Sequence, residues 1–446
     1  MIRKLFLFST VFLLIVQSCS AQTFNKARLD SLMDALAANN KAMVSIALTQ
    51  YGKPIYSKAV GYSLINSNQK IPATIQTHYR IGSITKVFTS VMVFQLIEEG
   101  KLQLTTPLAK FFPDLPNAGK ITMANLLSHS SGLHNFTNDS SYVTIMERKV
   151  TEAEMLTKFK GQPSDFEPGS KTEYSNTNFV LLGYIVEKLD KKPYAIALKN
   201  RILNKIDLKD TYYGDKINPA RQEAQSYKWD DSWKPATETD MSVPGGAGAL
   251  VSTPTDLTHF MDALFTGKLV SDSSLVHMKT IKGGFGMDLM SMPFYEQAGY
   301  GHSGGIDGFA SIAIYFPEKK LAFAYTANGA NMVINDMAVG ALSIALNRSY
   351  TLPTYTDKPF KLKPEDLDKY LGVYAAAGFP IKITITKNNA QLQAQGTGQH
   401  PFQLTATRTD EFSFGPAGIM LVFDPTKSQM TLKQGGKAYI LTKEKQ

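Results

Sequence analysis

The chain has 446 residues, of which 43% are hydrophobic and 19% are charged, and it carries a net charge of +9. This composition is typical of a globular protein and argues against a fibrous repeat or an intrinsically disordered chain. The length predicts two or three domains, and the absence of long Lys or Arg runs and of basic-aromatic alternation argues against a nucleic-acid groove.

The N-terminus has the pattern of a secretory signal. Arg3 and Lys4 precede an apolar run over 5–16 that is too short to span a membrane comfortably, and small residues follow it. Cleavage can follow Ala21, or it can precede Cys19 in a sequence that resembles a bacterial lipoprotein box, so that a lipid on Cys19 would anchor the protein to the envelope. We therefore predict a periplasmic or secreted protein, with the anchor left open. Cys19 is the only cysteine, which excludes an internal disulfide, a thiolate metal site and a cysteine nucleophile in the mature chain.

Residues 22–348 combine helical and strand patterns. Apolar spacing predicts helices over 23–39, 84–99, 178–189 and 331–346, and a Thr-Pro-Thr-Asp cap predicts another from Thr253. Alternating segments predict strands around turns at 51–54 and 317–320. Because strands lie at both ends of this segment, we expect an α+β domain whose sheet is built from distant parts of the chain.

The composition changes after this domain. Residues 349–367 are rich in proline and charge and are interpreted as a linker. Residues 368–446 consist of short alternating segments, which predict a small all-β domain of seven or eight strands, either a barrel or a sandwich.

The stretch "GSITK" places Ser83 three residues before Lys86 at a predicted helix start. Residues three apart share a helix face, so the Lys86 amine can reach the Ser83 hydroxyl. Burial in the apolar helix would lower the pKa of Lys86 and leave some neutral amine to act as a base. Taken alone, however, the pair is more simply explained as a helix cap followed by a surface lysine.

Two later stretches carry groups that suit the same chemistry. "YSN" contains Tyr174, which can relay a proton, and Asn176, which can bind a substrate amide. "HSGG" runs from His302 to Gly305 and leads into a predicted strand, where a backbone N–H can serve an oxyanion. Each stretch by itself has an ordinary explanation as a turn.

The order and spacing of the three motifs resemble the serine β-lactamase and penicillin-binding protein superfamily. The Tyr-x-Asn motif resembles the branch that contains class C β-lactamases, D-alanyl-D-alanine carboxypeptidases and esterases. "LLSHSSGL" at 126–133 and "PGGAGALVSTPTDLTHF" at 244–260 resemble the same branch. The resemblance covers about residues 25–347 and implies a β-lactamase/transpeptidase-like domain, with an antiparallel sheet, flanking helices and a helical subdomain.

The resemblance implies that Ser83 forms an acyl-enzyme and that Lys86 and Tyr174 move protons. Its motifs assign the remaining roles by position: Asn176, His302 and Gly304 would contact the substrate, and the backbone N–H groups of Ser83 and Gly305 would form the oxyanion hole. No cofactor and no metal is implied. His302 departs from the lysine usual at its position, and a histidine is mostly neutral at pH 7, which argues against an efficient β-lactamase.

The sequence therefore predicts an exported serine hydrolase that acts on amide or ester bonds of a D-amino-acid peptide, an ester or a β-lactam-like molecule, and esterase or D-Ala-D-Ala carboxypeptidase activity is favoured. The substrate would be a small molecule or short peptide, with the cell wall as one source. The alternative is a catalytically weak penicillin-binding or sensor protein that uses the same fold to bind a ligand.

Three further polar residues have local explanations. His129 is expected to be a hydrogen-bonded structural histidine, and His134 has no acidic partner at metal-ligand spacing. Asp307, in "GGIDGF", can face the cleft or hold a turn, and the turn is favoured.

Overall fold

The computed structural model describes residues 25–444 except for short gaps at 354, 356–359, 361, 378, 380, 389–390, 398–400, 415–418 and 435–436. The predicted signal, Cys19 included, lies outside the described residues. Within them, no helix has both the length and the apolar character needed to span a bilayer.

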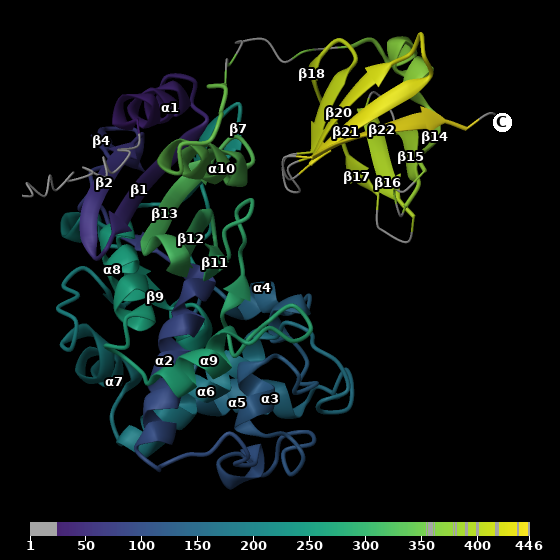
Figure 1. Ribbon diagram of the computed structural model, residues 1–446. Helices are drawn as coiled ribbons and strands as arrows, with labels where there is room; N and C mark the ends of the chain where they lie inside the picture. Colours follow the sequence, from purple (N-terminus) through teal and green to yellow (C-terminus); the bar gives the residue numbers. More distant parts are fainter. Residues whose placement is uncertain are drawn as a thin grey trace, which may run out of the picture.

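A six-stranded sheet forms the centre of the first domain (Figure 1). Its order is β10 (Met290–Ser291), β11 (Tyr300–Ile306), β12 (Phe309–Phe316), β13 (Leu321–Ala330), β1 (Ala42–Gln50) and β2 (Lys53–Val60). All pairs are antiparallel, and β1 pairs with β13 from Ala42 opposite Ala330 to Gln50 opposite Leu321. The expectation of one sheet built from the two ends of the domain is confirmed.

Helices cover both faces of this sheet. On one face, α1 (Lys26–Ala38) and α10 (Ile334–Ala345) bury their apolar sides against alternate residues such as Ile312 and Ile314. On the other face, α8 (Pro254–Phe265) packs against β1, β12 and β13, where Ala313 and Tyr315 point toward it. This division follows from strand geometry, because successive side chains point to opposite faces. Thr253 caps α8 through its side chain, as its motif predicts.

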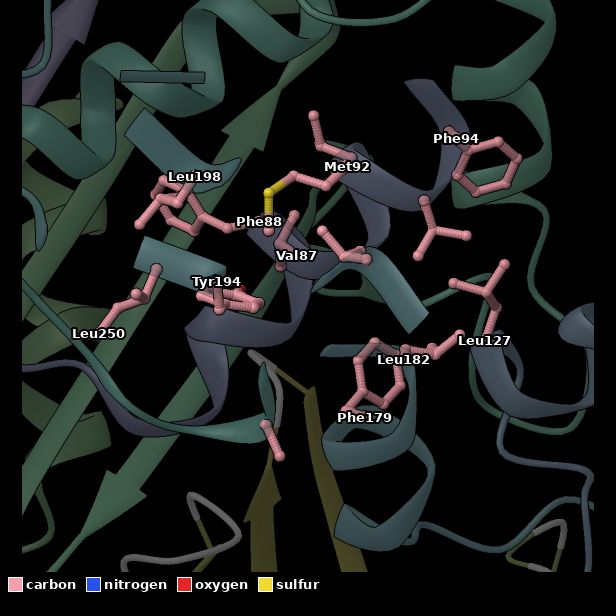
Figure 2. Close-up of a cluster of buried hydrophobic side chains, with 14 of the residues drawn as sticks. Val87, Phe88, Met92, Phe94, Leu127, Phe179, Leu182, Tyr194, Leu198 and Leu250 are labelled. Atoms are coloured by element: carbon pink, nitrogen blue, oxygen red, sulfur yellow. The ribbon is translucent and has the colours of Figure 1, made fainter. Parts of the chain in front are cut away.

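The helix α2 (Thr85–Glu98) is apolar on every side, and each residue from Thr85 to Leu96 is buried. Such a helix belongs in the interior, where its hydrophobic burial contributes on the order of 2 kcal/mol for each large side chain. It packs beside α6 (Asn176–Asp190). Figure 2 shows part of this core, with labels on Val87, Phe88, Met92, Phe94, Leu127, Phe179, Leu182, Tyr194, Leu198 and Leu250.

Shorter elements complete the first domain. The helices are α3 (Met123–Leu127), α4 (Tyr142–Ile145), α5 (Glu152–Lys160), α7 (Tyr194–Leu198) and α9 (Asp272–Lys279). The small strands are β3 (Tyr62–Ile65), β4 (Lys70–Pro72), β5 (Tyr79–Arg80), β6 (Tyr212–Tyr213), β7 (Tyr227–Asp230), β8 (Ser232–Pro235) and β9 (Leu250–Ser252). A 3-10 turn, Gly82–Ile84, leads directly into α2.

The C-terminal domain is a nine-stranded antiparallel sheet with its own core. The strands are β14 (Gly372–Ala375), β15 (Ile383–Asn388), β16 (Gln391–Gly396), β17 (Phe402–Gln403), β18 (Thr405–Arg408), β19 (Glu411–Phe414), β20 (Ile419–Asp424), β21 (Gln429–Gln434) and β22 (Lys437–Lys443). The edge strands β17 and β18 are separated only by the buried Leu404, so the sheet nearly closes into a barrel.

The strand count differs from the expected seven or eight for two local reasons. The segment "FQLTATRT" alternates like a single strand, but it bends at Leu404 and contributes to both edges of the sheet. The short strand β14 pairs with β15 and β22 and adds one more. Leu367 and Tyr370, from a 3-10 helix over Pro364–Tyr370, are buried in the same core.

Candidate active site

Ser83 lies in the 3-10 turn before α2, on the wall of a cleft of about 330 Å³. The cleft is also lined by Asn176 at the start of α6, by Ala247 and by Gly305 on β11. The predicted position of Ser83 at a helix start is therefore confirmed, and residues from four separate parts of the chain meet around it.

Lys86, the second residue of α2, is fully buried directly beneath this serine. Its Nζ lies 2.9 Å from Ser83 Oγ, 2.9 Å from Asn176 Oδ1 and 2.7 Å from the carbonyl oxygen of Ala247. Burial lowers the pKa of Lys86 to about 7, and only an ionised Asp288 would oppose this shift. A substantial fraction of neutral amine is therefore present near pH 7.

The hydrogen bonds of Lys86 fix the direction of its lone pair. A carbonyl oxygen can only accept, so Ala247 takes one N–H of the amine. Asn176 takes a second through Oδ1, because its Nδ2 group is committed as a donor to Asn135 Oδ1 and Thr137 Oγ1. In the neutral amine, the remaining position is the lone pair, and it faces Ser83 Oγ.

The Tyr174 hydroxyl lies 2.7 Å from Ser83 Oγ. Burial raises the pKa of Tyr174 above its ordinary value, so the phenol keeps its proton near neutral pH. Its ring packs on His129, with the ring centres 4.5 Å apart, and His129 Nδ1 accepts from the backbone N–H of Ser175 at 3.2 Å. These contacts are consistent with the structural role expected for His129.

The glycines of the third motif allow two backbones to approach closely. A Cβ on Gly304 would lie 2.0 Å from the carbonyl oxygen of Ile81, so any other residue there would push β11 away from the turn that carries Ser83. A Cβ on Gly82, whose φ is +50°, would lie 2.8 Å from the amide nitrogen of Gly305. The turn that carries Ser83 and the edge of β11 thus touch at the cleft.

His302 lies elsewhere than expected. Its predicted place is the strand side of the cleft, but its side chain is 3% exposed and faces the interior. Strand alternation explains the difference, because Ser303 is exposed and its neighbours therefore point to the buried face. His302 Nε2 lies 3.7 Å from Oδ1 of the fully buried Asp288, a residue that no sequence motif indicates.

Asp307 holds a turn, as favoured, and it also lines the cleft, which was the alternative, and pairs with the buried Arg80. Its φ is +55°, and its carboxylate accepts from Arg80 Nη1 at 3.0 Å and from Thr239 Oγ1 at 2.7 Å. His134 does have acidic partners, since it lies 2.8 Å from Asp165 and 3.0 Å from Asp139. In the described part of the chain, no group of three or more metal-binding side chains is arranged around a common point.

Comparison with known proteins gives the same family as the motifs. Residues 29–346 match the family model described as Beta-lactamase. Penicillin-binding protein 4* of Bacillus subtilis is 24% identical over 92% of this chain and 97% of its own length. The structure of D-amino acid amidase from Ochrobactrum anthropi SV3 complexed with L-phenylalanine is 28% identical, with a TM-score of 0.66 over 72% of this chain and 99% of the amidase.

A second solved structure extends over the C-terminal domain as well. The octameric penicillin-binding protein homologue from Pyrococcus abyssi covers 93% of this chain and 99% of its own, with 24% identity and a TM-score of 0.65, and it supports the fold. With the family model spanning the whole first domain, the chain belongs to the beta-lactamase family of serine hydrolases.

Proposed function

We propose that the protein hydrolyses amide bonds of small, D-configured amino-acid derivatives through an acyl-enzyme on Ser83. The observation that carries the proposal is the hydrogen bonding of Lys86, whose only uncommitted position faces Ser83 Oγ at 2.9 Å. Serine needs such a base, because its hydroxyl is a weak nucleophile at neutral pH.

In the first step, Lys86 takes the Ser83 proton while Oγ attacks the substrate carbonyl carbon. The backbone N–H groups of Ser83 and Gly305, which both line the cleft, stabilise the resulting oxyanion. The C–N bond then breaks. The Tyr174 hydroxyl, 2.7 Å from Ser83 Oγ, gives its proton to the departing nitrogen and regains one from Lys86.

In the second step, water replaces the amine. The Lys86 amine, neutral again, removes a proton from that water through the Tyr174 hydroxyl, and the ester bond to Ser83 is cleaved as Lys86 returns this proton to Ser83 Oγ, 2.9 Å away. The substrate carbonyl therefore passes through two tetrahedral states that use the same oxyanion donors. Asn176 lines the cleft and keeps its amide oriented through Asn135 and Thr137.

The choice of amides rests on the strand side of the cleft and on the relatives. With His302 buried, β11 presents to the cleft the backbone of Gly305 and Ile306 and no cationic side chain at the position where β-lactamases usually have a lysine. Lys228 on β7 is the lysine that lines this cleft. One structural relative is named a D-amino acid amidase and another a D-stereospecific amidohydrolase. The buried histidine in place of the usual lysine and the names of these relatives favour amides over β-lactams.

A covalent probe tests the acyl-enzyme. A fluorophosphonate should label the wild-type protein and fail to label Ser83→Ala. Ser90→Ala is the matched control, because Ser90 is a buried serine of α2, the helix that follows the turn with Ser83, and lies deeper in the core. Equal labelling of wild type and Ser83→Ala would refute the nucleophile.

A substrate panel tests the specificity. D- and L-phenylalanine amide, p-nitrophenyl acetate, nitrocefin and a D-Ala-D-Ala peptide are compared at equal concentration, and D-phenylalanine amide should give the highest kcat/KM. Labelling without turnover of any of them would favour the sensor or penicillin-binding alternative instead.

We also propose that the chain is exported. The support is the basic and apolar pattern of residues 3–16. The mass of the mature N-terminus, determined after expression in a bacterial host, would distinguish cleavage after Ala21 from cleavage before a lipid-modified Cys19.

A further inference from the structure

Asp288 is an unusual acid beside the proposed site. It precedes β10, is 0% exposed and has a backbone φ of +83°, a region that non-glycine residues rarely adopt. Neither of its carboxylate oxygens has a hydrogen-bond partner in the described part of the chain. A buried, unpaired carboxylate is strongly unfavourable. The acid must therefore keep its proton, or a neighbouring group must balance its charge.

His302 supplies the neighbouring atom. Its Nδ1 is hydrogen bonded to the carbonyl oxygen of Ser303, which can only accept, so Nδ1 carries the hydrogen. Nε2 of the neutral ring then carries a lone pair, and this nitrogen lies 3.7 Å from Asp288 Oδ1. Two acceptors facing each other in an apolar interior repel, whereas one proton between them would turn the contact into a hydrogen bond.

We propose that Asp288 and His302 share one proton, and that this pair compensates the charge that forms on Lys86 during acylation. In the resting state the proton is on Asp288 and points toward His302 Nε2, and the 3.7 Å contact must shorten before the proton can be shared. When Lys86 becomes an ammonium, the O–H bond of Asp288 breaks and an Nε2–H bond forms, which leaves a carboxylate that attracts the new cation and an imidazolium that keeps the pair neutral overall. No proton enters or leaves the pair, and Asp288 is a positioning residue that acts through Lys86.

The surroundings favour this arrangement. Burial raises the pKa of Asp288 well above its usual range and lowers that of His302 to about 3, so the proton rests on the acid. The titratable groups near Asp288 come from different elements: an ionised Asp288 would raise the pKa values of Lys86 on α2, Tyr174 before α6 and Tyr194 on α7. Of these three groups, only Lys86 is a cation when protonated.

The ring of His129 is a further titratable neighbour of His302. Its charge is coupled to His302, but its Nδ1 accepts from Ser175, so the neutral ring carries its hydrogen on Nε2. Burial lowers its pKa well below the ordinary value, so it brings no charge to the cluster near neutral pH. The Asp288–His302 pair is thus the group that can change its charge distribution beside Lys86.

The compensating role rests on the proposed function, whereas the shared proton does not. Infrared difference spectroscopy tests the proton directly. Wild type minus Asp288→Asn at pH 7 should show the carbonyl stretch of a protonated carboxylic acid, which shifts when Ser83 is labelled. Asn tolerates the left-handed backbone, so the variant should fold.

Two further variants test whether the infrared band belongs to Asp288. His302→Lys keeps Asp288 but places an ammonium beside it, so the acid band should disappear while a carboxylate appears. Asp207→Asn is the control, because Asp207 also has a left-handed backbone, with φ +52°, but lies exposed at the surface. Absence of the acid band from wild type, or its persistence in His302→Lys, would overturn the shared proton whether or not the enzyme is active.

Kinetics test the coupling to Lys86. Asp288→Asn should lower kcat/KM for amides roughly tenfold, because the neutral amide cannot become an anion opposite the ammonium. The acid limb of the pH–rate profile should stay in place, since the resting pair carries no net charge. An unchanged rate would overturn the coupling, as would an acid limb shifted to lower pH, which would indicate an ionised Asp288 in the resting state. Loss of Ser83 labelling in wild type would instead refute the proposed function and leave the infrared result intact.

Discussion

Lys86 Nζ and Asn176 Oδ1 lie 2.9 Å apart, and this contact joins the second residue of α2 to the first residue of α6. The two helices thus begin at the same point of the cleft, although 90 positions separate the residues. Because the contact uses one N–H of the amine, it also orients the atom that faces Ser83. A structural contact between two helices therefore sets the direction of the proposed base.

The activity should depend on pH through Lys86. The amine must be neutral to take the Ser83 proton, and burial lowers its pKa to about 7. We expect kcat/KM for D-phenylalanine amide to rise about tenfold per pH unit below pH 7 and to level off above it. A profile measured from pH 5 to 9 checks this. A flat acid side would show that another group is the base.

The lowered pKa of Lys86 should also make the free energy of unfolding depend on pH. Unfolded Lys86 binds a proton up to its usual pKa of 10.5, whereas the folded amine releases it near 7, so the unfolded state holds more protons between these values. Raising the pH over this window should therefore stabilise the wild type relative to Lys86→Met by up to about 1.4 kcal/mol per pH unit. Urea unfolding of both proteins at pH 7, 8 and 9 measures the difference, and parallel pH dependences would mean that Lys86 stays charged in the folded protein.

Tyr174→Phe should separate amides from activated esters. An amine leaving group needs the proton of the Tyr174 hydroxyl, whereas p-nitrophenolate leaves without one. We expect a loss of roughly a hundredfold or more in kcat/KM for the amide and a much smaller loss for p-nitrophenyl acetate. The ring contact with His129 is retained in the variant, so its stability should change little. Equal losses on both substrates would assign the hydroxyl to activation of Ser83 and not to the leaving group.

The parts of the site that depend on local spacing were predictable. Ser83 and Lys86 are three positions apart, and a helix brings such residues together in any fold. Thr253 has a cap motif that also acts locally, and α8 begins there. Tyr174 and Asn176 could be assigned only through the resemblance, because nothing in their own segment indicates that α6 lies beside α2.

Other partners in the site had no local signal. The Ala247 carbonyl is a main-chain group that any residue would supply, so no side-chain pattern identifies it. Asp288 lies more than two hundred positions from Lys86 in a glycine-rich stretch without periodicity. The inward direction of His302 depends on which face of β11 is buried, and that is decided by the packing of Gly304 against Ile81.

A pair of glycine variants should show whether the turn before α2 must touch β11. Gly82 and Gly100 both have positive φ, +50° and +71°, so alanine at either position should cost about 1–2 kcal/mol of stability. Only at Gly82 would the added methyl meet another chain segment, 2.8 Å from the amide nitrogen of Gly305, whereas no atom lies within 4 Å at Gly100.

Gly82→Ala should therefore move Ser83 away from the Gly305 amide and lower kcat/KM by about a hundredfold, the effect of losing one oxyanion donor. Gly100→Ala should keep full activity at a similar loss of stability, because its methyl enters open space. Urea unfolding and kcat/KM for both variants distinguish the two effects. If Gly82→Ala were as active as Gly100→Ala, the contact between the turn and the strand edge would not be needed to hold the oxyanion donors together.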